Sequence, residues 1–325
     1  MVQKTFAVAM LDALAYALAE DANVMVIGAS SFIYDRGLKP EDERALFDKF
    51  PTRLIDPPTS EGVVTSLAAG AAMAGMRPFV NYGTASFAFE AWNQLLNEIG
   101  PAHTMSGGQL RVPLVLHMFA GIRGGGAAQH STSPQAMFAN AAGLELVLPS
   151  SPADAQGLLR TALKSDNPTV FITHTKLVNV GGHVPAGDFA IPFGQADVKR
   201  AGRDVTVIAT SLMVQEALKA ADTLAREGIE VEVVDPRTIV PLDTAGILAS
   251  VRRTGRLVCV DEANGTCSIA SEISALAAEE AFTALKAPIL RVTRPSAPVS
   301  YSPPLEAYVT PTAEKIAAAV RKLMR

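Results

Sequence analysis

The sequence predicts an α/β fold made of two doubly wound units, and two observations carry this prediction. Short β-branched runs alternate with helical patterns along most of the 325 residues, as is typical of parallel sheets covered by helices on both faces. The alternation pauses once, at about residues 176–203, where glycine and proline remove any periodicity. At about 150 residues per domain, the length also favours two domains.

The first unit is expected over residues 1–180 and begins with a predicted helix at 6–20, which the Thr5 hydroxyl can cap. Short apolar runs without helical periodicity predict its buried strands. These runs lie at 24–27, 77–82, 112–117, 144–148 and 169–173. A linker is expected at 181–203.

The second unit is expected over residues 204–325, where the alternation of strands and helices resumes. Its predicted strands are 205–210, 229–235, 256–262 and 289–293. Its predicted helices are 213–227, 243–253, 268–284 and 313–324. The repeated strand–helix order again predicts a parallel sheet.

Charge and cysteine content restrict the classes of partner and compartment. The formal charge is −4 (28 Lys and Arg against 32 Asp and Glu), and no basic run exceeds two residues. This argues against a surface for nucleic acid or anionic membranes. No apolar run reaches the roughly 18 residues of a membrane span. Cys259 and Cys267 make neither a disulfide framework nor a four-ligand zinc site, so we expect a cytoplasmic protein.

Residues 61–75 form a predicted helix with almost no side-chain volume, EGVVTSLAAGAAMAG. Such a surface lets another backbone approach closely, although its glycines lower the helix propensity. The helix is therefore expected either to pack inside the protein or to contact another subunit.

Two residues stand out as candidates for chemistry. Glu61 follows DPPTS, where Thr59 or Ser60 can cap a helix whose dipole favours an ionised carboxylate in its first turn. His130 follows a glycine-rich loop that lacks the spacing and the lysine of a phosphate loop. Both residues also fit purely structural roles. The other histidines show no metal-ligand spacing, and the chain alone lacks a complete catalytic set.

Several segments, in order, resemble the β subunit of the first component of 2-oxo-acid dehydrogenase complexes, a pyruvate dehydrogenase β-like branch of the transketolase superfamily. They are RLIDPPTSEGVVTSLAAGAAMAGMRPFV, SFAFEAWNQLLNE, MSGGQLRVPLVL, GGGAAQHS, DAQGLLRTALKSDNP, VEVVDPRTIVPLD and RRTGRLVCVDE. The resemblance implies a thiamine-diphosphate-dependent enzyme. Residues 1–180 would be its pyrimidine-binding domain and residues 204–325 a transketolase C-terminal-like domain.

The resemblance also implies roles for three residues. Glu61 matches the glutamate that hydrogen-bonds the pyrimidine N1′ and favours the imino tautomer, which takes the proton from the thiazolium carbon. Phe87 matches the aromatic residue that stacks on the pyrimidine ring. His130 matches the histidine that faces the substrate or the acyl acceptor.

The cofactor-binding set is incomplete, because the family's GDG motif for diphosphate and magnesium is missing. In the family this motif lies on the α subunit. The resemblance therefore implies an α partner that holds most of the magnesium ligands, in an α2β2 hetero-tetramer. Positions of a cation-binding loop, which acts through backbone carbonyls, match Leu114, Ala162, Leu163 and Asn167. Potassium is thus a further candidate cofactor.

The expected function is decarboxylation of a 2-oxo acid and transfer of the acyl group to a lipoyl group on a carrier acyltransferase. The chain departs from the family pattern at Ala29 and Asn93, which replace acidic residues of a relay between paired active sites. It departs again at 117–121, HMFAG. These departures leave open a split transketolase or an acyloin-cleaving subunit, and a non-catalytic scaffold subunit is a further alternative.

Overall fold

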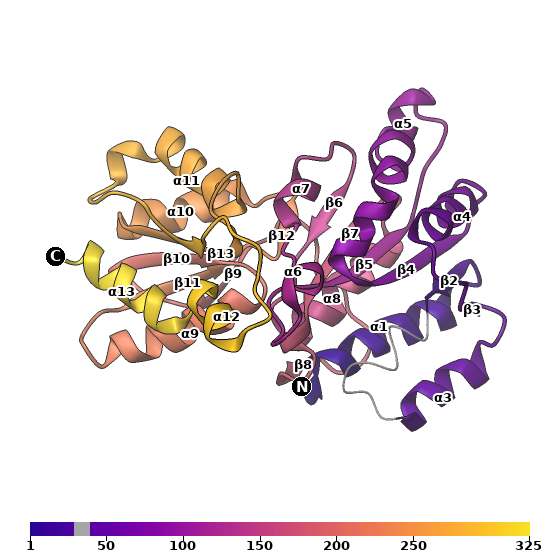
Figure 1. Ribbon diagram of the computed structural model, residues 1–325, viewed down its shortest axis with the longest axis horizontal. Coiled ribbons are helices and arrows are strands. Elements are labelled where there is room, and N and C mark those ends of the chain that lie inside the picture. The colour runs from indigo at the N-terminus through magenta and orange to yellow at the C-terminus, as the bar shows by residue number, and fades with distance from the viewer. Residues whose placement is uncertain (29–39) are drawn as a thin grey trace. The chain divides into compact units, whose positions relative to one another are not determined.

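The computed structural model describes residues 1–28 and 40–325, with side chains described from Ala45 onward in the second range. The chain divides into two compact units (Figure 1). Unit 1 comprises Met1–Ala120 and Met137–Phe193, and unit 2 comprises Gly121–Ala136 and Gly194–Arg325. The loop that carries His130 therefore belongs to unit 2, although the expected boundary assigns it to the first domain.

Unit 1 is built on a parallel sheet in which β6, β7, β5, β4, β2 and β3 are neighbours in that order. The strands are β2 (Val24–Ile27), β3 (Leu54–Ile55), β4 (Arg77–Thr84), β5 (Val115–Ala120), β6 (Glu145–Val147) and β7 (Thr169–His174). Strand β5 begins later than predicted, because Pro113 has no N–H group to donate to a neighbouring strand. The predicted parallel arrangement is confirmed.

The helical segments of unit 1 follow the same alternation. They are α1 (Phe6–Glu20), α3 (Pro40–Lys49), α4 (Glu61–Met73), the 3₁₀ helix η1 (Ala85–Ala91), the π-helix η2 (Gln94–Ile99), α5 (Ala102–Met105), α8 (Pro152–Lys164) and the 3₁₀ helix η3 (Thr175–Leu177). A further helix, α7 (Gln135–Ala139), begins in unit 2 and ends in unit 1. Thr5 Oγ1 accepts from Val8 N at 3.3 Å, which confirms the predicted cap of α1. None of the described helices is long and apolar enough to cross a membrane.

The segment expected to be a linker contains two strands. Strand β8 (Gly181–Val184) pairs antiparallel with β1 (Val2–Thr5) in unit 1. Strand β9 (Asp197–Arg200) pairs antiparallel with the edge of the sheet of unit 2. Both strands are short, so the glycines and prolines around them mask the signal that longer strands give.

Unit 2 has a sheet in the order β14, β13, β10, β11, β9, parallel except for β9. The further strands of this sheet are β10 (Val205–Ala209), β11 (Val231–Asp235), β13 (Leu257–Asn264) and β14 (Leu290–Arg294). Unit 2 also contains the short strand β12 (Thr238–Val240), which is not part of this sheet. Its helices are α6 (Ala127–His130), α9 (Leu212–Ala225), α10 (Thr244–Thr254), α11 (Ile269–Glu280), η4 (Phe282–Ala284), α12 (Pro303–Val309) and α13 (Ala313–Leu323). The helix predicted at 268–284 ends at Glu280, and a single 3₁₀ turn follows it.

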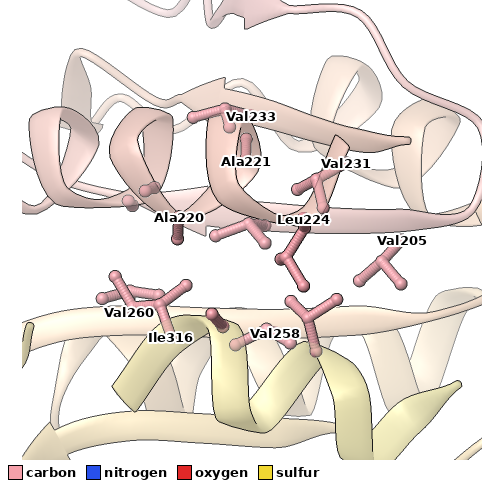
Figure 2. Packing of buried hydrophobic residues seen from close by; sticks show 14 of the residues in the cluster. Val205, Ala220, Ala221, Leu224, Val231, Val233, Val258, Val260 and Ile316 are labelled. Carbon is pink, nitrogen blue, oxygen red and sulfur yellow. The ribbon is translucent and has the colours of Figure 1, made fainter. Parts of the chain in front are cut away.

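The core of unit 2 lies between the sheet and the helices α9 and α13 (Figure 2). Ala217, Ala220 and Leu224 repeat at spacings of three and four, so they face the strands from one side of α9. Ile316 on α13 and Val258 on β13 join the same cluster. The valines of parallel strands are buried here as the continuous apolar runs predict.

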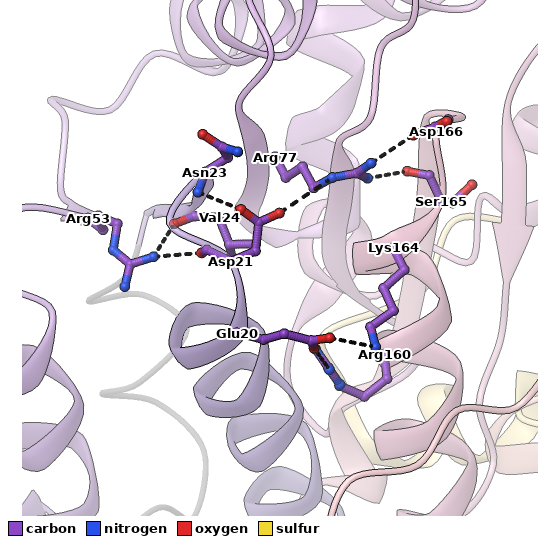
Figure 3. Close-up of polar contacts among 10 residues, drawn as sticks. All are labelled: Glu20, Asp21, Asn23, Val24, Arg53, Arg77, Arg160, Lys164, Ser165 and Asp166. Atoms are coloured by element: carbon purple, nitrogen blue, oxygen red, sulfur yellow. Dashed lines mark hydrogen bonds and ion pairs between the residues drawn. The ribbon is translucent and has the colours of Figure 1, made fainter.

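Charged side chains tie α1 to α8 in unit 1 (Figure 3). Arg160 on α8 is only 1% exposed, and its guanidinium forms an ion pair with Glu20 at the end of α1. It also donates to both oxygens of Asp188, at 2.6 and 2.7 Å. These contacts lower the pKa of Asp188 below its ordinary value. A buried guanidinium is stable here because two carboxylates neutralise it.

Asp188→Asn is expected to lower the free energy of unfolding by about 1–2 kcal/mol at pH 7, because the buried Arg160 then keeps only Glu20 as a charged partner. The expected loss stays below that of a fully buried pair, since the Asp188 side chain is 36% exposed. Arg160 lowers the pKa of Asp188 in the folded protein below the ordinary value of 3.8. The stabilisation is therefore fully present above pH 3.8 and is lost as the pH falls through the lower pKa of the folded state.

Urea unfolding at a series of pH values checks this expectation. Glu227→Gln is the matched control, because Glu227 pairs with Arg321 on the exposed surface and should change the unfolding midpoint little. Equal midpoint shifts in the two variants would contradict the importance of the Arg160 cluster.

Candidate functional site

Glu61 is the first residue of α4, and its side chain is half-buried. The helix begins there because Ser60 is extended (φ −165°, ψ 96°), while Ser60 O accepts from Val64 N at 2.9 Å. The Ser60 side chain makes no capping hydrogen bond, so the predicted side-chain cap is wrong at this residue. The positive end of the helix dipole thus faces a carboxylate rather than a serine hydroxyl.

Thr65 and Tyr82 fix the first turn of α4 against β4. Thr65 Oγ1 donates to Glu61 O at 2.6 Å and lies 2.6 Å from Tyr82 Oη, so the phenol hydroxyl donates to Thr65. Burial raises the pKa of Tyr82, and the negative charge of Glu61 raises it further. Tyr82 therefore stays protonated and can donate this hydrogen bond. It lies close enough to Glu61 for the charge of the carboxylate to affect the pKa of the phenol.

Phe87 lies in η1, directly after β4, and its ring is half-buried. The start of α4 lies against this segment: a Cβ added at Gly62 would be 3.5 Å from Glu90 O. Glu61 and Phe87, two residues singled out from the sequence, are therefore carried by neighbouring elements of unit 1. Their common corner is at the carboxyl end of β4, where ligands bind in open α/β sheets.

A buried polar chain joins β4, β5 and β7 in the middle of the sheet. His117 on β5 is fully buried, with Nδ1 2.8 Å from Asn81 Oδ1 on β4 and Nε2 2.9 Å from Thr173 Oγ1 on β7. Asn81 Oδ1 also accepts from Gly83 N at 3.2 Å, so it acts as an acceptor toward His117. His117 Nδ1–H therefore donates to Asn81 Oδ1, and Nε2 shares the second hydrogen bond with the Thr173 hydroxyl.

His130 ends the short helix α6, and unit 2 holds the loop in which it lies. Ile122 N donates to Glu262 Oε1 at 2.5 Å, and Arg294 Nη1 donates to Ser131 O at 3.2 Å. Gly121 N donates to Thr132 O at 2.9 Å and closes the loop on itself. His130 is half-buried and belongs to a different unit from Glu61 and Phe87.

The four positions of the candidate cation loop all lie in unit 1, two of them at the end of α8. Ala162 and Leu163 lie in its last turn, and Ala162 O accepts from Ser165 N at 3.2 Å. Leu114 O accepts from Thr169 N at 2.9 Å, and Asn167 Nδ2 donates to Glu145 Oε1 at 3.0 Å. Among the described residues, no group of three His, Cys, Asp or Glu side chains could hold a metal ion.

Two parts of the site were not identified from the sequence. The Thr65–Tyr82 contact joins residues 17 apart, and the His117 chain joins three strands, so neither leaves a local pattern. Of the two departures in the acidic relay, Ala29 lies outside the described residues. Asn93 precedes η2, and its Oδ1 accepts from Asn97 Nδ2 at 2.7 Å.

Known families and relatives match almost the whole chain. Residues 3–180 match the family "Transketolase, pyrimidine binding domain", and residues 194–316 match "Transketolase, C-terminal domain". The β subunit of acetoin:2,6-dichlorophenolindophenol oxidoreductase of Cupriavidus necator is 44% identical over 87% of this chain and 83% of its own length. The β subunit of the pyruvate dehydrogenase E1 component of Rickettsia conorii is 38% identical over 99% and 98%.

A third relative and one solved structure are also similar to this chain over most of its length. The β subunit of 2-oxoisovalerate dehydrogenase of Bacillus subtilis is 37% identical over 96% of this chain and 97% of its own length. A solved structure described as a split-gene transketolase, an inactive β4 tetramer, superposes with a TM-score of 0.79 over 98% of this chain and 97% of that one. At 24% identity, that structure supports the fold alone.

Thr173→Val is expected to lower the free energy of unfolding by about 1–2 kcal/mol, because the near-isosteric change removes the hydroxyl partner of His117 Nε2 inside the sheet. Thermal or urea unfolding measures the loss. Thr104→Val on exposed α5 is the control and should stay within about 0.5 kcal/mol of the wild type. A Thr173 variant as stable as the control would count against a stabilising hydrogen bond between His117 and Thr173.

Proposed function

We propose a function from one premise: the chain belongs to the transketolase family and, within it, groups with the β subunits of the pyruvate dehydrogenase type. In this proposal it is the β subunit of a thiamine-diphosphate-dependent 2-oxo-acid dehydrogenase first component. The enzyme decarboxylates a 2-oxo acid and transfers the acyl group to a lipoyl carrier. The supporting observation is the position of Glu61 at the start of α4, beside the segment that carries Phe87.

The residues of unit 1 fit the pyrimidine half of the cofactor. A half-buried carboxylate at a helix start and a half-buried aromatic ring on the neighbouring η1 supply a hydrogen-bond acceptor and a stacking face. When bound, thiamine diphosphate supplies a carbanion equivalent that attacks the substrate carbonyl. Glu61 holds a proton at the pyrimidine N1′, and Phe87 keeps the ring in one orientation.

His130 acts on the substrate side. Its loop is anchored to unit 2 at Ile122 and Ser131, so the imidazole is carried by a fixed backbone. A histidine held in this way can donate a hydrogen bond to charge that develops on the substrate oxygen or can transfer a proton.

An α partner completes the proposed site in an α2β2 assembly and supplies the diphosphate and magnesium ligands. The outer face of α4 suits such a contact: Val63 is 67% exposed and Leu67 is 52% exposed. Gly70 continues the same stripe, and a Cβ there would meet nothing within 4 Å. A close-packing apolar face on an exposed helix is typical of subunit contacts. A lipoyl carrier acyltransferase is the further partner.

We also propose potassium at the end of α8. The helix dipole is negative at this end, and a carbonyl oxygen has two lone pairs, so Leu114 O and Ala162 O can each coordinate a cation beside their present hydrogen bonds. The free cysteines Cys259 and Cys267 agree with the proposed cytoplasmic location.

Cleavage of an acyloin is the second candidate function. Relatives that are 44% and 38% identical are named as acetoin oxidoreductase subunits. In this chain the segment from His117 to Gly121, HMFAG, replaces the Arg-Gly-Pro-Asn-Gly segment that is usual in the family, so the residues there differ from those of the 2-oxo-acid dehydrogenases.

Reconstitution with the α partner, thiamine diphosphate and magnesium decides between the candidates. Dye reduction is measured with pyruvate, 2-oxoisovalerate and acetoin as separate substrates. Turnover of a 2-oxo acid is the expected result. Turnover of acetoin alone would replace the main proposal by the second, and an assembly that does not bind the cofactor in calorimetry would favour a scaffold.

Glu61→Gln is expected to leave cofactor affinity nearly unchanged and to lower turnover, because the amide keeps the shape and loses the charge that stabilises protonated N1′. The expected loss is about 2–4 kcal/mol of transition-state stabilisation, or roughly 30- to 1,000-fold in kcat. Glu90→Gln, on the exposed side of η1, is the control. Full turnover by the Glu61 variant would remove this residue from the mechanism.

The chain without its partner is expected to self-associate, because the exposed α4 stripe then has no α subunit to cover it. The net charge of −4 opposes association only weakly. Analytical ultracentrifugation with and without the α partner measures the assembly. Leu67→Lys, which places a charge on the stripe, should reduce both self-association and binding of the partner. A stable monomer of the wild-type chain would contradict the expectation.

A further inference from the structure

The glycine-rich loop that carries His130 is held by the C-terminal part of unit 2. Gly124 and Gly125 have positive φ angles of 87° and 71°, a conformation that side chains rarely adopt. Their N–H groups both point to one carboxylate. Gly124 N donates to Glu306 Oε1 at 3.0 Å, and Gly125 N donates to Glu306 Oε2 at 3.2 Å.

Glu306 lies on α12 and is only 7% exposed, so its charge is removed from water and depends on these donors. Hydrogen bonds between a carboxylate and backbone N–H groups are stronger than those between neutral groups. A bidentate contact to two successive amides also fixes the direction of the loop. Glu306 therefore acts on the loop backbone across about 180 residues of sequence.

Apolar contacts strengthen the same attachment. Ile122 forms a buried cluster with Val299 and Val309. A Cβ at Gly125 would lie 3.6 Å from Tyr301 Cε2. We name residues 299–309 the C-terminal clasp, because they cover one side of the loop with both apolar and polar contacts.

The contacts that hold Gly125 also restrict His130, because the loop between these two residues is compact. A Cβ at Gly126 would be 2.7 Å from Ser131 Oγ, so the first half of the loop touches the residue that follows His130. Arg294 holds the carbonyl of Ser131 from the other side at 3.2 Å. Because both halves of the loop are in contact, we expect a displacement of Gly124 and Gly125 to displace α6 as well.

We propose that Glu306 is a positioning residue: its carboxylate holds the glycine-rich loop so that His130 meets the substrate or acyl acceptor in one fixed geometry. This inference rests on the proposed function for the role of His130. The loop contact itself does not depend on that role. The C-terminal clasp thus controls a residue of the site without touching substrate.

Hydrogen–deuterium exchange of the α/β assembly tests the contact directly. In Glu306→Gln, one of the two acceptors becomes an NH₂ group that faces a backbone donor, so amides 122–131 should exchange roughly tenfold faster or more. Glu306→Asp keeps both acceptors but retracts them, and it should give an intermediate rate. Glu314→Gln, on the exposed start of α13, should leave the rate unchanged. Unchanged exchange in both Glu306 variants overturns the proposal.

Steady-state kinetics tests the consequence for His130. Glu306→Gln should lower kcat roughly ten- to a hundredfold, as misplacement of a reacting group does, with unchanged affinity for thiamine diphosphate. In a His130→Gln background, the same change should add no further loss, because the positioned group is already absent. Equal losses in both backgrounds would show a merely structural role and overturn the proposal.

The two readouts separate this inference from the proposed function. If the wild-type assembly turns over no candidate substrate, the proposed function fails, and the exchange rates still decide whether Glu306 holds the loop. If Glu61→Gln lowers turnover but Glu306→Gln does not, the proposed function stands and the positioning role of Glu306 fails. Should Glu306→Gln not fold, the Glu306→Asp variant carries both measurements.

Discussion

Hydrogen bonds that run from Tyr82 through Thr65 to the backbone of Glu61 are the constraint on which the candidate site depends. They join the end of β4 to the first turn of α4, two elements separated by a chain reversal. Since Tyr82 is buried and its pKa is raised, its hydroxyl remains protonated and can donate near neutral pH. The Glu61 carboxylate thus starts from a fixed backbone, which a group that must hold a proton at one ring atom requires.

The two units contribute different parts of the proposed chemistry. Unit 1 carries Glu61 and Phe87, which suit the cofactor ring, and unit 2 carries His130, which suits the substrate. In unit 2, buried carboxylates from α12 and β13 bind backbone N–H groups of the glycine-rich loop. Each unit therefore fixes its functional residue with groups of its own sheet and helices.

Sequence reasoning identified the features that local patterns encode. Buried parallel strands appear as apolar runs, the Thr5 cap precedes the helix α1, and DPPTS marks the start of α4 at Glu61. Features that depend on residues far apart in the sequence could not be predicted. Strand β9 gains its place from pairing with β11, and the Glu306 contact joins residues that no local pattern relates. The predicted Ser60 cap is absent, although the helix does begin directly after Ser60.

The most direct measurement is a crystal structure of this chain with its α partner, thiamine diphosphate and magnesium. We expect a Glu61 carboxylate oxygen within hydrogen-bond distance of the pyrimidine N1′, about 2.6–3.2 Å. We also expect the Phe87 ring to lie parallel to the pyrimidine ring. A cofactor bound with its N1′ against another group, or Glu61 turned toward solvent, would contradict these expectations.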